Sequence, residues 1–116
     1  MRLDTAFDML KEAFPKAYEV SHPEKVNQKG LYLYFDGVTP RDPCKDAAHF
    51  VLLLAGVTLS NKGDDSIIKE LQAIRKKVFE LGVKEQKNFF RGVKAAVFEG
   101  DKLFMYAIKL EIEVSI

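Results

Sequence analysis

The sequence predicts one α+β domain over residues 1–116, with two helices packed on one face of a mostly antiparallel sheet of about five strands. Apolar residues recur at helical spacing in two segments, residues 3–14 and 67–81. Every second residue from Phe104 to Ile116 is apolar, which is the period of a strand with one buried face. Aromatic and β-branched runs between these segments predict the order α-β-β-β-α-β-β.

The first helix is expected to end near Phe14, because the residue before a proline disfavours the helical region and Pro15 follows. Short strands are expected over residues 17–21 and 31–35, the second closed by a turn at Asp36-Gly37. Residues 36–47 hold Pro40, Pro43 and several charges. They are expected to form a long irregular loop that projects from the end of the sheet, and loops of this length are often functional.

Residues 50–59 form a nearly continuous apolar run, which predicts a central strand covered on both faces. A buried helix is the alternative, but the Val and Thr content and Gly56 favour a strand. The second helix is expected to begin after Asp64, Asp65 or Ser66 and to stop at Gly82. Its buried face is predicted to comprise Ile67, Ile68, Leu71, Ile74, Val78, Phe79 and Leu81.

Two strands are expected to close the chain, residues 93–97 and 104–116, with a turn at residues 99–102. Glu111 and Glu113 fall on the face of the last strand opposite its apolar residues. Two carboxylates about 7 Å apart could serve acid–base chemistry, but a solvated outer face is the commoner explanation.

Composition and charge limit the classes of function. The formal net charge is +1 and the chain has one cysteine, so no internal disulfide can form. The polar N-terminus does not match a signal peptide, and the longest apolar run is too short to span a bilayer, so a cytoplasmic protein with no membrane partner is expected. Basic residues near Phe89 and Phe90 could contact nucleic acid, but a nearly neutral chain makes nucleic acid an unlikely specific ligand. Those basic residues are Lys84, Lys87, Arg91 and Lys94.

Candidate catalytic and metal-binding residues gather between residues 36 and 49. Cys44 and His49 could form a nucleophile pair, with His22 as another imidazole, yet no family signature surrounds the cysteine. The nearby carboxylates, Asp36, Asp42 and Asp46, lack the ligand spacings of zinc or calcium sites. We therefore expect no enzyme activity, no metal and no cofactor.

Several stretches give the chain a resemblance to a known family. They are an opening helix that ends in Phe14-Pro15, a strand that runs from His49 through Leu54 into Gly56-Val57, a helix over residues 67–75, and a closing hairpin from Val93 to Ile116. This order resembles the tail-completion proteins, or tail terminators, of long-tailed phages and prophages, and the minor tail proteins of Mu-like phages.

The resemblance implies a structural role. Such proteins form a ring, typically hexameric, that caps the tail tube in the virion and offers a surface for joining the head. A ring requires two different surfaces on each subunit. We expect them to include residues from the basic 62–94 segment, the acidic 95–116 segment and the 36–47 loop. The candidate interface residues are Arg41, Phe89, Phe90, Arg91, Glu111 and Glu113. The alternative is a small ligand- or peptide-binding module.

Overall fold

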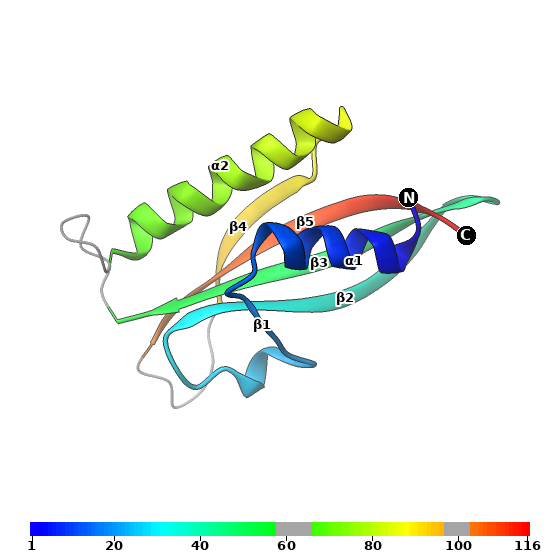
Figure 1. Cartoon of the computed structure of the whole chain (residues 1–116). Helices are drawn as coiled ribbons and strands as arrows, with labels where there is room; N and C mark the ends of the chain where they lie inside the picture. The colour runs from blue at the N-terminus through cyan, green and yellow to red at the C-terminus, as the bar shows by residue number, and fades with distance from the viewer. Residues whose placement is uncertain (58–65, 97–102) are drawn as a thin grey trace.

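The computed structural model describes residues 1–57, 66–96 and 103–116 (Figure 1). Its elements are α1 (Leu3–Ala13), β1 (Tyr18–Glu19), the 3₁₀ turn η1 (Pro23–Lys25), β2 (Gly30–Asp42), β3 (Lys45–Gly56), α2 (Ile67–Glu85), β4 (Phe90–Ala96) and β5 (Phe104–Ser115). Helix caps at Asp64 or Asp65, strand ends at Leu59 and Val97, and the turn at residues 99–102 lie outside the described residues.

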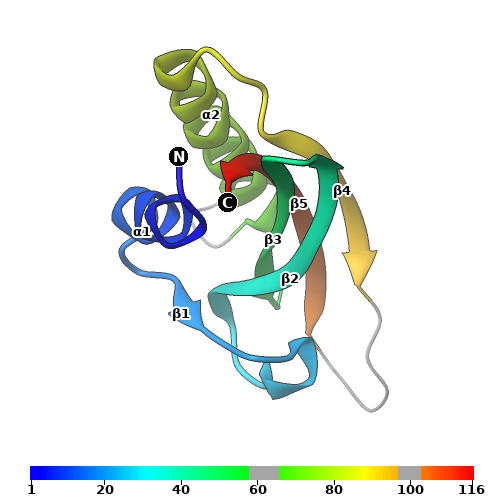
Figure 2. The same ribbon diagram turned by 90° about the vertical axis from the view of Figure 1, so that its right-hand side faces the viewer.

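The strands form one sheet in the order β1-β2-β3-β5-β4. The two-residue β1 pairs parallel to β2, and all other pairs are antiparallel. Both helices lie on the same face of the sheet, as the view along the strands shows (Figure 2). The predicted α+β class and the mostly antiparallel sheet are therefore confirmed.

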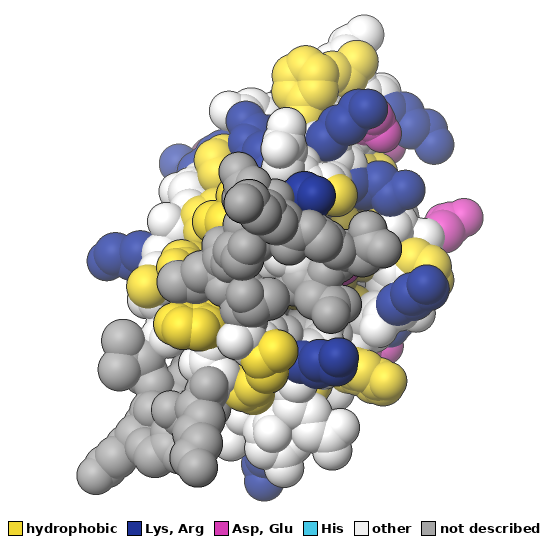
Figure 3. All heavy atoms as spheres, turned by 90° about the vertical axis from the view of Figure 1, so that its left-hand side faces the viewer, with side chains coloured by type: hydrophobic (Ala, Val, Ile, Leu, Met, Phe, Trp, Pro, Cys, Tyr) yellow, Lys and Arg dark blue, Asp and Glu magenta, His cyan; other side chains and the backbone are white. Residues whose placement is uncertain are grey.

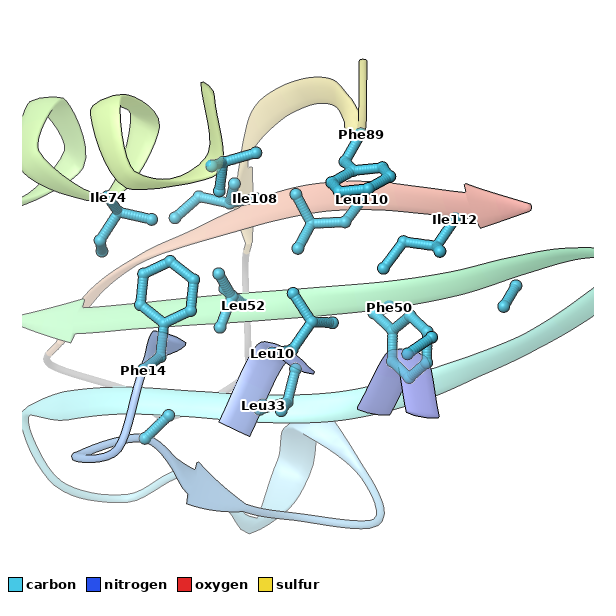
Figure 4. Close-up of a cluster of buried hydrophobic side chains, with 14 of the residues drawn as sticks. Leu10, Phe14, Leu33, Phe50, Leu52, Ile74, Phe89, Ile108, Leu110 and Ile112 are labelled. Atoms are coloured by element: carbon cyan, nitrogen blue, oxygen red, sulfur yellow. The ribbon is translucent and has the colours of Figure 1, made fainter. Parts of the chain in front are cut away.

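The main core lies between the two helices and the sheet. Leu10 of α1, Phe14 directly after α1 and Ile74 of α2 point toward Leu52 and Ile108 of the central strands (Figure 4). On β5, alternate residues from Ile108 enter this core, as the period of two predicts. Those residues are Ile108, Leu110, Ile112 and Val114.

A second, smaller cluster covers the other face of the sheet. Val51 and Leu53 of β3 pack there with Met105 of β5 and with Val26, which lies in the connection between β1 and β2. Strand β3 therefore has buried side chains on both faces, and the prediction made from its continuous apolar run is confirmed.

The prediction that residues 36–47 form an irregular loop is wrong. β2 and β3 continue as a hairpin whose tip is a tight turn, in which Asp42 Oδ1 accepts from the Cys44 backbone N–H at 2.9 Å and Pro43 supplies a fixed φ. Pro40 is tolerated because β1 pairs only with residues 32 and 33, so β2 is an edge strand here and needs no N–H. We call residues 36–47 the arm. Its β3 half pairs with β5 as far as Lys45 and Ser115, and the Ile116 N–H donates to the Cys44 carbonyl at 3.1 Å, so the tip lies beside the C-terminus.

The expected stop at Gly82 is also wrong, because α2 continues to Glu85. Gln86 ends it in the left-handed conformation (φ 57°), and the Lys87 N–H donates to the Gly82 carbonyl at 2.8 Å. This is the Schellman arrangement, displaced by one turn from the glycine. Gly82 serves instead as a contact point, since a Cβ there would overlap the Lys87 carbonyl oxygen. At the other end, Ser66 caps the helix by accepting from the Lys69 N–H at 3.3 Å.

Replacing Gly82 with alanine should lower the free energy of unfolding by about 1–2 kcal/mol, because the methyl group collides with backbone that cannot move away. An ordinary helix-interior glycine would gain about 1 kcal/mol from the same change. Urea unfolding followed by circular dichroism measures both. Gln86→Gly is the control: it should raise stability by about 0.5–1 kcal/mol, since it relieves a left-handed side chain. A stabilised Gly82→Ala variant would contradict the contact.

The predicted apolar face of α2 is only partly buried. Ile67, Ile74 and Val78 enter the core, but Ile68 is 44% exposed and Phe79 is 60% exposed. Phe79 lies one residue past Val78 and therefore about 100° around the helix from the buried stripe. α2 thus presents exposed apolar side chains on a second side.

Candidate functional site

A row of charged side chains crosses the outer face of the sheet, opposite the helices. It contains one residue from each of the four longer strands, namely Arg41 of β2, His49 of β3, Glu111 of β5 and Arg91 of β4. Arg41 and Arg91 both donate from Nη2 to Glu111 Oε2, Arg91 at 3.2 Å. His49 Nδ1 lies 3.9 Å from Glu111 Oε1. One carboxylate of β5 thereby joins the neighbouring β4 with β2, which is distant in sequence.

Strand irregularities aim both arginines at Glu111. The β4–β5 register shifts between Phe90 and Gly92, so Arg91 is an extra residue without a partner in the ladder. The β2–β3 register shifts between Pro40 and Asp42, which leaves Arg41 in the same position on its strand. A bulged residue is freed from strict alternation and its side chain is redirected. Gly92 permits the first bulge with φ +123°, a value that side chains rarely adopt.

Glu111 is not the solvated residue expected from the alternation of β5, because its side chain is only 16% exposed. Burial alone would raise the pKa of its carboxyl group. The charges of Arg41 and Arg91 and their hydrogen bonds outweigh that effect, so the pKa is lowered and the group is ionised at neutral pH. Glu113 is half-exposed and pairs with Lys45 at 3.4 Å. Glu111 therefore holds Arg41, next to the tip of the arm, against β5, whereas Glu113 makes one surface pair.

His49 also contacts Thr39, whose Oγ1 lies 2.9 Å from its Nε2. Hydroxyl, imidazole and carboxylate thus follow one another as in a hydrolase triad, but a separation of 3.9 Å is too long for a carboxylate–imidazole hydrogen bond. Cys44 is exposed at the tip of the arm, where its N–H is bonded to Asp42. The partners of His49 are Thr39 and Glu111, so the structure does not bring Cys44 and His49 together as a nucleophile pair.

The two adjacent phenylalanines take different positions. Phe89 is 4% exposed and belongs to the main core, which leaves it no surface for a subunit contact. Phe90 is half-buried, and the Arg75 guanidinium lies 4.0 Å from its ring centre. Phe89 therefore has no surface to offer a base, and one face of the Phe90 ring is already contacted by Arg75.

A groove of about 820 Å³ lies on the helix-bearing side of the sheet, between the end of α1 and α2. Phe14, Leu31 and Ile74 contribute its apolar lining. Residues of the β3 end and of α2 complete the walls, among them Gly56, Ala73 and Glu80. Four lysines also line it, from three parts of the chain, namely Lys16, Lys29, Lys76 and Lys77. No sequence motif marks this groove, because its lining comes from both halves of the chain.

The groove and the arm lie toward opposite ends of the sheet. The groove is lined by Gly30, Leu31 and residues 54–57, and the arm is formed by the opposite ends of the same two strands, β2 and β3. Viewed from the end away from the arm, the surface carries Lys and Arg side chains around apolar ones (Figure 3). Acidic side chains are visible in that view only toward its right-hand side.

Comparison with protein-family models and with curated proteins finds no match to this chain. None of the described helices is long and apolar enough to cross a membrane. Within residues 1–57, 66–96 and 103–116, no three His, Cys, Asp or Glu side chains are grouped to hold a metal ion. The two features on which a function can be argued are therefore the arm with its charged row and the groove.

Proposed function

We propose that this protein is a non-enzymatic assembly protein that forms a ring of identical subunits, similar in role to the tail terminators of long-tailed phages. In that role the ring caps the tail tube in the virion and offers its free face to head-completion proteins. The tail tube and those proteins are the proposed partners, together with further copies of the chain.

The arm is the observation that carries the proposal. Its residues 38–45 are exposed, although its β3 half pairs with β5 as far as Lys45. The β2 half has no strand partner on the side away from β3 among the described residues, so its backbone groups are open to another chain. Arg41, next to the turn at the tip, is paired with Glu111 of β5, and this contact holds the arm against the sheet in one direction.

Exposed apolar side chains elsewhere are consistent with a second, different contact surface. Phe79 and Val83 on α2 are each 60% exposed, and Val57 at the end of β3 is 60% exposed. Contacts between unlike surfaces of identical subunits generate a closed ring when the rotation closes.

The groove favours a second candidate function, a binding module for a small anionic or amphipathic ligand. Its volume of about 820 Å³ lies within the range of ligand pockets, and it combines an apolar lining with lysines. This function requires no self-association, because one subunit supplies the whole lining of the groove.

Mass measurement and electron microscopy of the purified chain separate the two candidates. Light scattering from low micromolar to millimolar concentration should show a concentration-dependent oligomer, and micrographs should show closed rings. A monomer over the whole range, with dispersed small particles in the micrographs, would contradict the assembly function and leave the binding module.

A further inference from the structure

The groove and the arm are complementary in charge. We propose that, in the assembled protein, the arm of one subunit occupies the groove of the next. The partner for the groove is thus a second copy of this chain. This inference rests on the proposed assembly function and adds the contact by which the subunits join.

The four lysines that line the groove form no ion pairs within the described parts of the subunit. Glu70 and Glu80 also line the groove, so lysines outnumber carboxylates two to one. Unpaired like charges around an apolar lining favour an occupant that carries acidic groups and apolar surface.

The arm has an excess of unpaired negative charge, because its two basic residues already form ion pairs. Arg41 is paired with Glu111 and Lys45 with Glu113, both on β5 of the same subunit. Its three aspartates have no cationic partner in the described parts of the chain, and Asp42 accepts only a backbone N–H. These aspartates are Asp36, Asp42 and Asp46. An approaching subunit therefore meets uncompensated negative charge.

The arm also offers apolar surface of the right kind. Val38 is 45% exposed, and Pro40 and Pro43 are exposed near the tip. These short rigid side chains lose little conformational freedom on burial, so docking them against Phe14 and Ile74 in the groove costs little side-chain entropy.

The placement of the two surfaces gives a head-to-tail contact. The long axis of the molecule spans 45 Å. The arm lies at one end of β2 and β3, and Gly30, Leu31 and residues 54–57 at the other end of these strands line the groove. An arm that enters the neighbour's groove leaves that neighbour's arm free for the next subunit. Repetition of one such heterologous contact builds a ring when the rotation between subunits closes.

The single cysteine of the chain provides the test, because Cys44 lies exposed at the tip of the arm. Ala73→Cys places a second thiol on the α2 wall of the groove, at an exposed position. Under mild oxidation the assembled variant should form intersubunit disulfides, seen as a ladder of dimers and higher species on a non-reducing gel. Gln72→Cys is the matched control, since the neighbouring residue on the same helix is exposed and does not line the groove. It should give at most a small fraction of the crosslinking.

Charge reversal gives an independent measurement that does not depend on disulfide geometry. Lys76→Glu with Lys77→Glu in the groove, or Asp36→Lys with Asp46→Lys on the arm, should each weaken self-association at least tenfold. The chain with all four changes should recover it, because the contact is then restored with its signs exchanged. Lys84→Glu with Lys94→Glu, away from both surfaces, should have a much smaller effect.

The outcomes separate this inference from the proposed function. Wild-type rings without Ala73→Cys crosslinks, and without rescue in the fourfold variant, would overturn the arm-in-groove contact and leave assembly standing. Equal crosslinking of the Gln72→Cys control would also overturn it. A wild-type chain that is monomeric at all concentrations would overturn the proposed function and this contact together. A selective Ala73→Cys ladder together with charge rescue is the result we expect.

Discussion

Replacing Leu53 with alanine should lower the free energy of unfolding by about 2–5 kcal/mol, as a large-to-small change in a core does. Leu53 is 1% exposed and belongs to the cluster on the outer face of the sheet, where it packs with Val51 and Met105. A domain of this kind has a total stability of about 5–15 kcal/mol, so this single change removes a large fraction of it. The expected result would show that the outer cluster is a true second core.

Leu52→Ala is the companion variant, because Leu52 is the next residue on β3 and faces the helices, with no exposed surface. Both changes should fall in the same range of about 2–5 kcal/mol. Val83→Ala, at a side chain that is 60% exposed, is the control and should change stability by less than about 0.5 kcal/mol. Denaturant unfolding of all three variants measures the differences. A Leu53→Ala effect as small as that of Val83→Ala would show that only the helix side of the sheet is packed.

The second large effect is expected at Glu111. Changing it to glutamine should lower the free energy of unfolding by about 1–3 kcal/mol at pH 7, because hydrogen bonds to charged groups are lost and two guanidinium groups lose their anion. Glu113→Gln is the matched control two residues along the same strand. Its half-exposed pair with Lys45 should contribute less than about 1 kcal/mol.

Glu111 also predicts a pH dependence. The folded protein holds the pKa of this carboxyl group below its ordinary value of 4.5, so the unfolded chain takes up the proton more readily. The contribution of Glu111 to stability is therefore complete above the unfolded pKa and is lost as the pH falls through the lower, folded value. Unfolding curves at pH 7, 5, 4 and 3 should show the difference between wild type and Glu111→Gln shrinking below about pH 4.5. A difference that stays constant with pH would show that the ion pairs contribute nothing.

The regular elements followed from local patterns. The alternation of β5 predicted which side chains enter the core, and the apolar run of residues 50–57 predicted a central strand covered on both faces. These predictions succeed because burial leaves a pattern in the sequence. A strand buried on one face has alternating apolar residues, and a strand buried on both faces has a continuous apolar run. The start of α2 at Ser66 was among the expected caps for the same kind of local reason.

The candidate site depended on facts that no local pattern contains. Arg41 and Arg91 reach Glu111 because each is displaced by an irregularity in its strand, and a bulge depends on the register of two strands that are distant in sequence. Of the six candidate interface residues, Arg41, Arg91 and Glu111 form one cluster, while Phe89 is in the core. The groove could not be predicted, since its lysines approach one another only when α1 and α2 lie on the same face.

The sequence by itself determined the α+β class, the order of the elements and the inward face of the last strand, because each is recorded in the spacing of apolar residues. Tertiary structure decided the rest. Pro40 and Pro43 disfavour a strand by propensity, yet residues 36–42 pair with β3 as part of β2. Pro40 is tolerated because this part of β2 has no strand partner on the side away from β3, so no N–H is needed there. Gly82 looks like a helix stop, yet it lies within α2. A glycine is required there because the Lys87 carbonyl oxygen lies where a Cβ would be. The deciding fact is a missing strand partner in the first case and a backbone contact in the second, and the local sequence reveals neither.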